Sequence, residues 1–166
     1  TNVEYIGNQH LKNISQKIEV YKIIVSDNKD DVSSIPESFT EIDQEIRYCS
    51  SKDNTIIAYA KVGNGPAILK APNFMSSLEH DWRSPIWTHM YRFLAEKNTL
   101  VRFDQRGNGS SDLDPLDITF ESFVEDVDAV VNDAKINKFP ILGVSQGCAV
   151  SIAYAIKNPN KVSHLI

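Results

Sequence analysis

A pentapeptide of the form Gly-x-Ser-x-Gly occupies residues 143–147, near the C-terminus. It follows the apolar run 139–142 and precedes the apolar segment 148–156, an order that predicts a short buried strand, a turn and a helix. A serine on such a turn holds its hydroxyl above the sheet edge, where a base can reach it. The flanking glycines suit a strained turn with a helix packed closely behind it. The pattern predicts Ser145 as a nucleophile; the alternative is a glycine-rich turn with a solvent-facing serine.

A serine hydroxyl needs a base, and the base needs a third group to orient it. After a strand–turn–helix nucleophile, the acid and then the histidine follow in the chain. Residues 146–166 contain no Asp or Glu, and their one histidine is His164, in the apolar segment 162–166. We interpret that segment as a core strand and His164 as a strand residue. We therefore expect a fragment of a longer protein, cut at both ends, because an initiator Met is also missing.

The composition excludes several classes of protein. Apolar residues make up 42% of the chain and charged residues 23%, which are globular values. The net charge of −5 argues against nucleic acid and anionic membranes as partners. No apolar run approaches the ~20 residues of a membrane span. Cys49 and Cys148 fit neither a disulfide framework nor a zinc site. We expect both to be buried in a cytoplasmic protein without a metal or cofactor, whose partner is a small molecule.

The first 43 residues divide into two segments. Residues 1–25 are predicted to be a β-rich tail, with alternation over 3–6, a chain reversal at Gly7-Asn8 and a longer β-rich run over 18–25. Residues 26–43 are predicted to be a linker, because their first part is polar, acidic and interrupted by Ser and Pro.

Residues 44–166 alternate between strand and helix patterns. The expected strands are 46–49, 55–62, 67–70, 99–103, 139–142 and 162–166. The expected helices are about 84–97, with Ser84 as its N-cap, then 119–135, and an almost wholly apolar one after Ser145. This alternation predicts an α/β fold, with a mostly parallel sheet and helices on both faces.

Several other polar and aromatic residues have competing interpretations. We expect Asp104, Arg106 and Asp112 to be structural, because polar side chains can satisfy the backbone of their glycine-containing loop. The alternative is a functional charged loop.

Some of the histidines and aromatic residues ahead of Ser145 are also site candidates. His80 and His89 precede it, opposite to the expected chain order, so we assign them to the surface. Phe74, Trp82 and Trp87 either line a pocket mouth or belong to the core, and both interpretations stay open.

Residues 44–166 resemble the N-terminal half of an α/β-hydrolase-fold domain. The matching segments are the opening hairpin, 63–66, 104–112 and 143–147. The resemblance implies that fold with its C-terminal half missing, and a serine nucleophile that hydrolyses an ester or similar small acyl substrate. A serine there favours ester hydrolysis over epoxide or haloalkane chemistry, which in this fold runs through an alkyl–enzyme ester. Residues 70–73, 81–82 and 84–87 resemble those of one subgroup, whose hydrolase-like domains are fused to signalling or regulatory modules.

One departure from the family pattern concerns the oxyanion hole. Many members place His-Gly after the third strand, where this chain has residues 71–74, Ala-Pro-Asn-Phe. Pro72 has no N–H to donate. The resemblance therefore assigns the oxyanion hole to the backbone N–H of Gln146 with that of Asn73 or Phe74.

Residues 7–14 and 18–21 resemble the closing strands of a class III adenylate or guanylate cyclase catalytic domain. They cover none of the residues that such a cyclase uses for metal, nucleotide or catalysis. The resemblance implies an attached cyclase domain and a role in signal transduction. Two functions follow for the hydrolase-like portion: an enzyme, or a non-catalytic sensor that binds a small apolar ligand and regulates the cyclase. An acid and a histidine beyond residue 166 favour the enzyme, and their absence favours the sensor.

Overall fold

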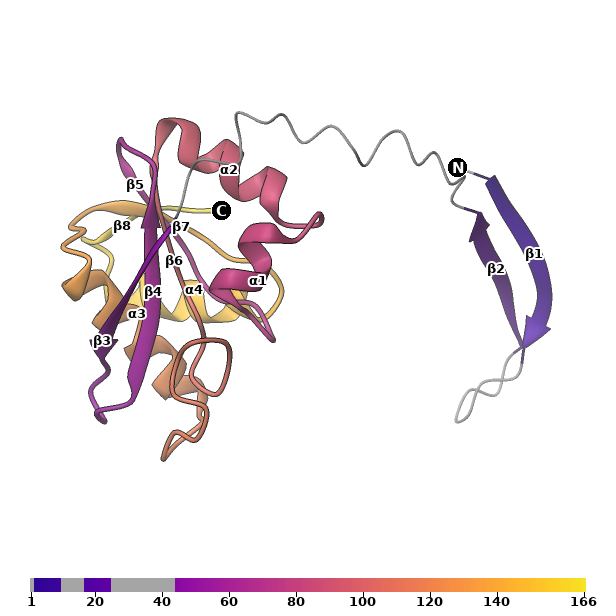
Figure 1. Ribbon diagram of the computed structural model, residues 1–166. Helices are drawn as coiled ribbons and strands as arrows, with labels where there is room; N and C mark the ends of the chain where they lie inside the picture. The colour runs from indigo at the N-terminus through magenta and orange to yellow at the C-terminus, as the bar shows by residue number, and fades with distance from the viewer. Residues whose placement is uncertain (1, 10–16, 25–43) are drawn as a thin grey trace. The chain divides into compact units, whose positions relative to one another are not determined.

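The computed structural model describes residues 2–9, 17–24 and 44–166 (Figure 1). The chain separates into two compact units, Thr1–Phe39 and Thr40–Ile166. The predicted linker, residues 26–43, lies outside the described residues.

The first unit contains an antiparallel pair of strands, β1 (Asn2–Gln9) and β2 (Ile18–Ile24). The chain reversal predicted at Gly7-Asn8 is wrong, because β1 continues through both residues. The pairing register shifts between Tyr5 and Gly7, and Gly7 has a φ of 118°. Glycine adopts this conformation without the steric cost that a side chain imposes, so it accommodates a bulge in a continuous strand.

The second unit is built on one sheet in the order β3-β4-β6-β5-β7-β8. Its strands are β3 (Glu45–Ser50), β4 (Ile56–Val62), β5 (Ala67–Lys70), β6 (Thr99–Phe103), β7 (Phe139–Leu142) and β8 (Val162–Leu165). β3 pairs antiparallel with β4, and β4 with β6. The pairs β5–β6, β5–β7 and β7–β8 are parallel. The predicted strands and the mostly parallel sheet are therefore confirmed.

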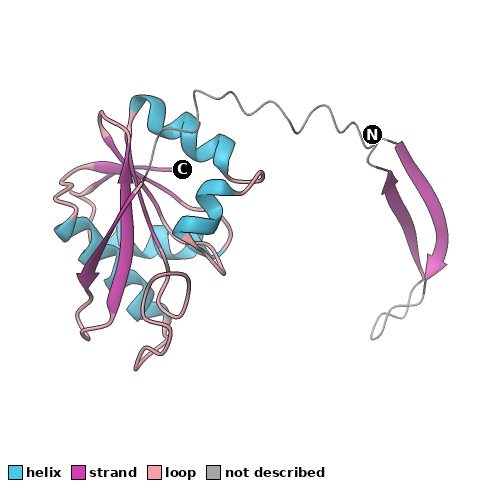
Figure 2. Cartoon of the chain, viewed as in Figure 1, coloured by secondary structure: helices cyan, strands magenta, loops and turns pink. Residues whose placement is uncertain are grey.

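Helices cover both faces of this sheet (Figure 2). They are α1 (Leu78–Arg83), α2 (Thr88–Lys97), α3 (Phe120–Asp133) and α4 (Gln146–Lys157). Leu69 of β5 packs in the cluster that contains residues of α3 and α4. Its neighbour Ile68 packs with Tyr91 and Ala95 of α2. Since successive strand residues point to opposite faces, α2 covers one face while α3 and α4 cover the other.

The helix predicted from Ser84 to Lys97 begins later in the structure. Ser84 caps the C-terminal end of α1, and α2 begins at Thr88 without a side-chain cap. The carbonyl of Ser84 accepts hydrogen bonds from the N–H groups of Trp87 and Thr88, so a turn precedes α2. Ile86 lies in that turn, outside α2, and is 78% exposed. α1 was not predicted from the sequence.

The helix predicted over 119–135 is confirmed as α3. Thr119 and Ser122 form a reciprocal capping box at its start. Val127, Val130 and Val131 are buried against the sheet as the spacing predicts, whereas Phe120 is 44% exposed.

The last strand, β8, pairs with β7 and lies at the sheet edge among the strands that the structure describes. Although the helix after Ser145 is almost wholly apolar, α4 is not buried on every side: Ile152 and Ile156 are exposed, while Val150 and Tyr154 are buried. The α4 helix therefore buries one stripe and leaves the other uncovered.

No helix within the described residues has the length and apolar character to cross a membrane. Within the same part of the chain, no three His, Cys, Asp or Glu side chains are grouped as metal ligands.

Candidate active site

Ser145 lies on the turn between β7 and α4, in a backbone conformation that side-chain-bearing residues rarely adopt. Its φ is 54° and its ψ −121°, outside the regions favoured by residues with a Cβ. Ser145 is exposed, and its side chain makes no capping hydrogen bond to α4. The structure therefore does not use this hydroxyl as a helix cap, although serine is a preferred capping residue. A strained, exposed and uncapped serine matches the geometry of a nucleophile held on a strand-to-helix turn.

Both flanking glycines are required by close packing. A Cβ at Gly143 would lie 2.7 Å from the Cα atom of Cys148. A Cβ at Gly147 would lie 2.8 Å from the carbonyl oxygen of Pro72. The first turn of α4 therefore approaches both the end of β7 and the loop after β5 more closely than a larger residue allows.

The loop after β5 carries the predicted oxyanion residues Asn73 and Phe74. Its first residue, Ala71, donates a backbone hydrogen bond to the carbonyl of Leu142 at 2.9 Å. Asn73 is partly buried, and Phe74 is 66% exposed. Since β5 and β7 are parallel neighbours, their carboxyl ends meet at one sheet edge. The structure thus brings the turn of Ser145 and Gln146 together with the loop of Asn73 and Phe74.

A third loop joins this arrangement through Gln105, which follows β6. The Nε2 atom of Gln146 donates to the Oε1 atom of Gln105 at 3.0 Å. The backbone N–H of Gln105 donates to the Oγ atom of Ser76 at 3.1 Å. Gln105 was not predicted as a site residue. Its position two residues beyond the end of β6 was the available signal.

Asp104 is fully buried beside this network. Its carboxylate accepts hydrogen bonds from the N–H groups of Leu78 and Ser110, each at 2.8 Å. Burial raises the pKa of the Asp104 carboxyl to about 6, although both hydrogen bonds act in the opposite direction. Asp104 therefore ties the loop after β6 to the start of α1, in the structural role that we expected.

Arg106 and Asp112 also make structural contacts. The fully buried Arg106 guanidinium binds both carboxylate oxygens of Asp126, at 2.8 and 2.6 Å, and binds Asp53 at 2.6 Å. The hydrogen bonds from Arg106 lower the pKa of the Asp53 carboxyl. Asp112 accepts a hydrogen bond from the N–H of Ile56 at 2.6 Å. These contacts anchor the loop to α3 and to the β3–β4 hairpin.

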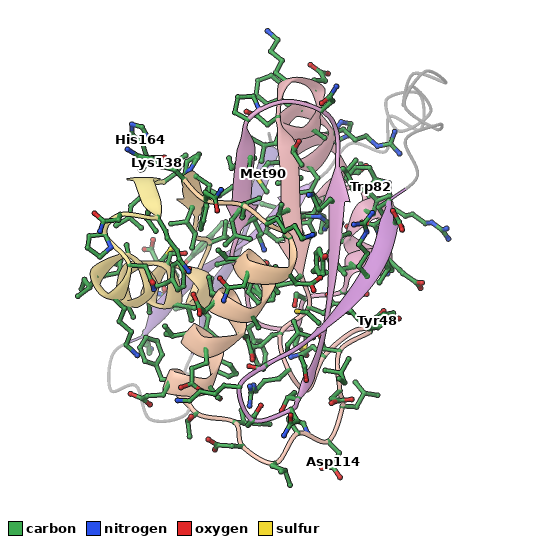
Figure 3. The ribbon with its side chains drawn as sticks, turned by 90° about the vertical axis from the view of Figure 1, so that its left-hand side faces the viewer. Tyr48, Trp82, Met90, Asp114, Lys138 and His164 are labelled. Atoms are coloured by element: carbon green, nitrogen blue, oxygen red, sulfur yellow. The ribbon has the colours of Figure 1, made fainter. Side chains whose placement is uncertain are left out.

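The histidines within the described residues occupy surface positions. His80 and His89 are exposed, as expected. His164 is exposed on β8, with its Nδ1 atom 3.2 Å from the Oγ atom of Ser163, and Figure 3 shows it at the periphery. No histidine side chain in the described part of the chain is hydrogen-bonded to a carboxylate. An acid–histidine pair for Ser145 is thus not provided by the described residues.

The three aromatic residues with two open interpretations differ in burial. Trp82 is 6% exposed and belongs to the core cluster under α2. Trp87 is partly buried and stacks on Tyr91, with ring centroids 6.0 Å apart. Phe74 is exposed beside the Ser145 edge.

The two cysteines are both free. Cys49 is buried, as expected, and burial raises the pKa of its thiol to about 12. Cys148 is exposed on the first turn of α4, so the expectation that it is buried is wrong. The outer side of this turn is not covered by other described residues.

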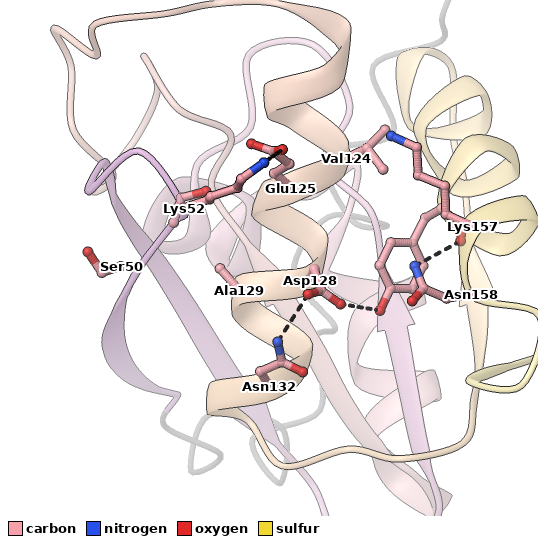
Figure 4. Close-up of a pocket in the computed structure, with 11 residues that line it drawn as sticks. Ser50, Lys52, Val124, Glu125, Asp128, Ala129, Asn132, Lys157 and Asn158 are labelled. Atoms are coloured by element: carbon pink, nitrogen blue, oxygen red, sulfur yellow. Dashed lines mark hydrogen bonds and ion pairs between the residues drawn. The ribbon is translucent and has the colours of Figure 1, made fainter.

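A groove of about 490 Å³ lies between the β3–β4 turn, α3 and α4 (Figure 4). Lys52 and Glu125 form an ion pair of 2.8 Å in its lining. Asp128 accepts hydrogen bonds from Tyr154 at 3.2 Å and Asn132 at 3.1 Å. None of its lining residues belongs to the Ser145 turn, so the groove is separate from the candidate site.

The comparisons with known proteins agree with this architecture. A comparison with curated proteins found no match. Similar solved structures include a hydrolase from Pseudomonas aeruginosa, 22% identical over 73% of this chain, with a TM-score of 0.64. An esterase from a Rhodococcus species is 26% identical over 72% of the chain, with a TM-score of 0.63. A haloalkane dehalogenase from Bradyrhizobium elkanii is 19% identical over 74%, also with a TM-score of 0.63.

The chain spans 44% of the length of the first two of these structures and 39% of the third. At this level of identity they establish a shared fold. The family model of the alpha/beta hydrolase fold matches residues 76–166, which include α1, the β6 loop, the Ser145 turn and β8. The chain belongs to the α/β-hydrolase fold family.

Proposed function

We propose that Ser145 is the nucleophile of a hydrolase that cleaves an ester or a similar small acyl substrate. One observation carries the proposal: Ser145 is exposed and uncapped, with a φ of 54°, at the carboxyl edge of a parallel sheet. Strained backbone persists where the surrounding structure holds it, and such positions cluster at active sites. A serine that served only the fold would be expected to cap α4.

The proposed chemistry begins with attack of the Ser145 Oγ atom on the substrate carbonyl carbon, while a base takes the hydroxyl proton. The carbonyl oxygen becomes an oxyanion, held by the N–H of Gln146 and that of Asn73 or Phe74. Collapse expels the alcohol, which takes the proton from the base and leaves an acyl ester on Ser145. Water, deprotonated by the same base, then releases the acid and restores the serine hydroxyl.

The base and its orienting acid belong, in this proposal, to a segment of the protein beyond residue 166. His164 is an unsuitable base because it is exposed on β8, where Ser163 is its hydrogen-bonding neighbour. The similar structures are more than twice as long as their matched part, which leaves room for an acid and a histidine after the serine.

The class of substrate follows from the nucleophile. Similar structures include an esterase, a haloalkane dehalogenase and an epoxide hydrolase. Epoxide and haloalkane chemistry in this fold uses an aspartate that forms an alkyl ester, as the family resemblance implies. Ser145 instead forms an acyl ester, so the proposal is limited to substrates with an activated carbonyl.

The experiment compares Ser145→Ala with the wild type in the full-length protein, using p-nitrophenyl acetate as substrate. We expect kcat to fall by about 10³-fold or more, with a residual rate above that in water from the oxyanion hole. Ser163→Ala on β8 is the matched control and should keep wild-type activity. Undiminished hydrolysis by Ser145→Ala rules out the proposed nucleophile.

We also propose that residues 1–25 are the tail of an attached cyclase domain and that residues 26–43 link it to the hydrolase domain. The resemblance of residues 7–14 and 18–21 supports this, as does the antiparallel pairing of β1 with β2. The two free cysteines support a cytoplasmic location. If the segment after residue 166 lacks an acid and a histidine, the domain is instead a ligand sensor for the cyclase.

A further inference from the structure

The β5 strand ends with a buried lysine. The segment that follows, residues 71–77, carries Asn73 and Phe74 and is called the oxyanion loop below. Lys70 is 3% exposed. Lys70 lies two residues after Ile68, which packs under α2. Side chains two positions apart on a strand point to the same face, so Lys70 points to the face that α2 covers. Arg102 of β6 is its register partner and is 4% exposed. Two cations therefore lie side by side beneath the α1–α2 layer.

The surroundings of Lys70 are costly for an ammonium group. Its Nζ atom lies 5.7 Å from the ring centroid of Trp87 and 5.9 Å from that of Tyr91. Among the described residues, none of the ion pairs involves Lys70. Burial lowers the pKa of Lys70 to about 8, with Arg102 acting in the same direction and Asp81 and Asp104 opposing it. A methionine or leucine would fill this volume without that cost.

The polar contact of Lys70 is with the oxyanion loop. Its Nζ atom donates a hydrogen bond to the Oδ1 atom of Asn73. The Nδ2 atom of Asn73 in turn donates to the carbonyl oxygen of Phe74 at 3.2 Å. The next residue, Met75, has a φ of 55°, which turns the chain sharply. These two hydrogen bonds form a brace from the rigid end of β5 across the loop.

The neighbouring buried cation, Arg102, makes its contacts outside this loop. Its Nη2 atom donates to the side chain of Gln44 at 2.7 Å and to the carbonyl of Leu78 at 3.2 Å. Its guanidinium also lies 4.1 Å from the ring centroid of Tyr91. Packing under α2 therefore accounts for Arg102, whereas the hydrogen bond of Lys70 is made to Asn73.

We propose that Lys70 is the positioning residue of the oxyanion loop, and that it acts through Asn73 to fix the peptide groups of residues 73–75. The catalytic consequence rests on the proposed function. An oxyanion donor works only if it is preorganised, since small displacements of a catalytic group are costly in rate. Lys70 holds this loop to the end of β5. The loop needs such a contact because its tip, at Phe74 and Met75, is exposed.

The kinetic test is a double-mutant cycle in the full-length protein with Lys70→Met, Asn73→Ala and both together. Each single variant should lower kcat by about 10- to 100-fold and leave KM within about 2-fold. The double variant should be no slower than the slower single variant, because both changes remove one brace. Lys61→Met, a lysine on β4 that contacts the Ala134 carbonyl, is the control and should keep wild-type kcat. Multiplied losses in the double variant overturn the proposal.

The second readout, hydrogen exchange of residues 71–75, does not depend on activity. Lys70→Met should speed exchange there by about 10-fold or more while the sheet exchanges as in the wild type. If Lys70→Met does not fold, Asn73→Ala, at a partly buried loop position, tests the same brace. Unchanged exchange in the folded variant overturns the proposal. If the wild type lacks Ser145-dependent turnover, the proposed function fails, and the exchange data decide on the brace alone.

Discussion

The side-chain amide of Gln146 donates a hydrogen bond to the side-chain carbonyl of Gln105 at 3.0 Å. Gln146 follows the candidate nucleophile, and Gln105 follows β6. The backbone N–H of Gln105 is itself bonded to Ser76, at the far end of the loop after β5. The loops after three neighbouring parallel strands are thus joined at the edge where Ser145 is exposed.

Removal of the Gln105 side chain should weaken this connection and slow the proposed reaction. A neutral hydrogen bond contributes about 1 kcal/mol, so Gln105→Ala should lower kcat by about 5-fold. Steady-state kinetics on p-nitrophenyl acetate measures the effect, with Gln9→Ala in the N-terminal unit as the control. An unchanged kcat would show that the Gln105–Gln146 contact does not influence Ser145.

Arg106 should dominate the stability of the loop after β6. Asp126 is 1% exposed, so Arg106→Met leaves a buried carboxylate without its partner and should cost about 3–5 kcal/mol in the free energy of unfolding. Arg47→Met, which breaks the exposed pair with Glu45, should cost far less than Arg106→Met, because water screens that pair. Urea denaturation of both variants at pH 7 makes the comparison. Equal losses would contradict the assigned role of Arg106.

The buried Lys70 should also give stability a characteristic pH dependence. Its pKa is about 8 in the folded chain and 10.5 as the ordinary value. Between these values the unfolded chain holds a proton that the folded chain has lost, so the wild type gains stability as pH rises from about 8 to 10.5.

The Lys70→Met variant should lose this slope and be more stable than the wild type at pH 7, by up to about 3 kcal/mol. Urea denaturation at pH 7, 9 and 10 compares the two. If Lys70→Met has a higher free energy of unfolding but faster hydrogen exchange at residues 71–75, then burial of the charge costs stability while Lys70 still positions the loop. Parallel stability curves for the two proteins would contradict the burial of a charged lysine.

The uncovered sides of α4 and β8 predict self-association of residues 1–166 expressed alone. Ile156 is 75% exposed, Leu165 52% and Ile166 63%. Apolar surface at an unpaired strand edge favours association between chains. Ile156→Lys combined with Leu165→Lys should shift sedimentation toward the monomer. Expressed alone, the wild-type segment should sediment as larger species, and a monomeric wild type would contradict this prediction.

Local patterns were sufficient for much of this fold. The strands of the second unit and the turn at Ser145 were predictable because apolar periodicity and paired glycines act over a few neighbouring residues. The start of α2 was not, because Ser77 and Ser84 are equally suitable caps, and tertiary packing decided that Ser77 begins a separate helix. The bulge at Gly7 was mistaken for a reversal because glycine serves both purposes.

The candidate site was predictable only in part. Ser145 carries its own local signature, and its glycines are explained by the approach of α4 to Pro72. The contacts of Gln105 with Gln146 and of Arg106 with Asp53 and Asp126 join positions 20 to 53 residues apart. No local pattern specifies such pairs. Lys70 resembled an ordinary strand-end residue until the structure placed it against Trp87 and Tyr91.

The most direct test of Ser145 is covalent trapping. An alkyl fluorophosphonate reacts with an activated serine by losing fluoride and forming a phosphonyl ester on the Oγ atom. Mass spectrometry of the treated full-length protein should find one adduct, on the peptide that contains Ser145. The adduct should be absent from Ser145→Ala and present in Ser163→Ala. Equal labelling of Ser145→Ala, or an adduct confined to another residue, would contradict the assignment of Ser145 as the nucleophile.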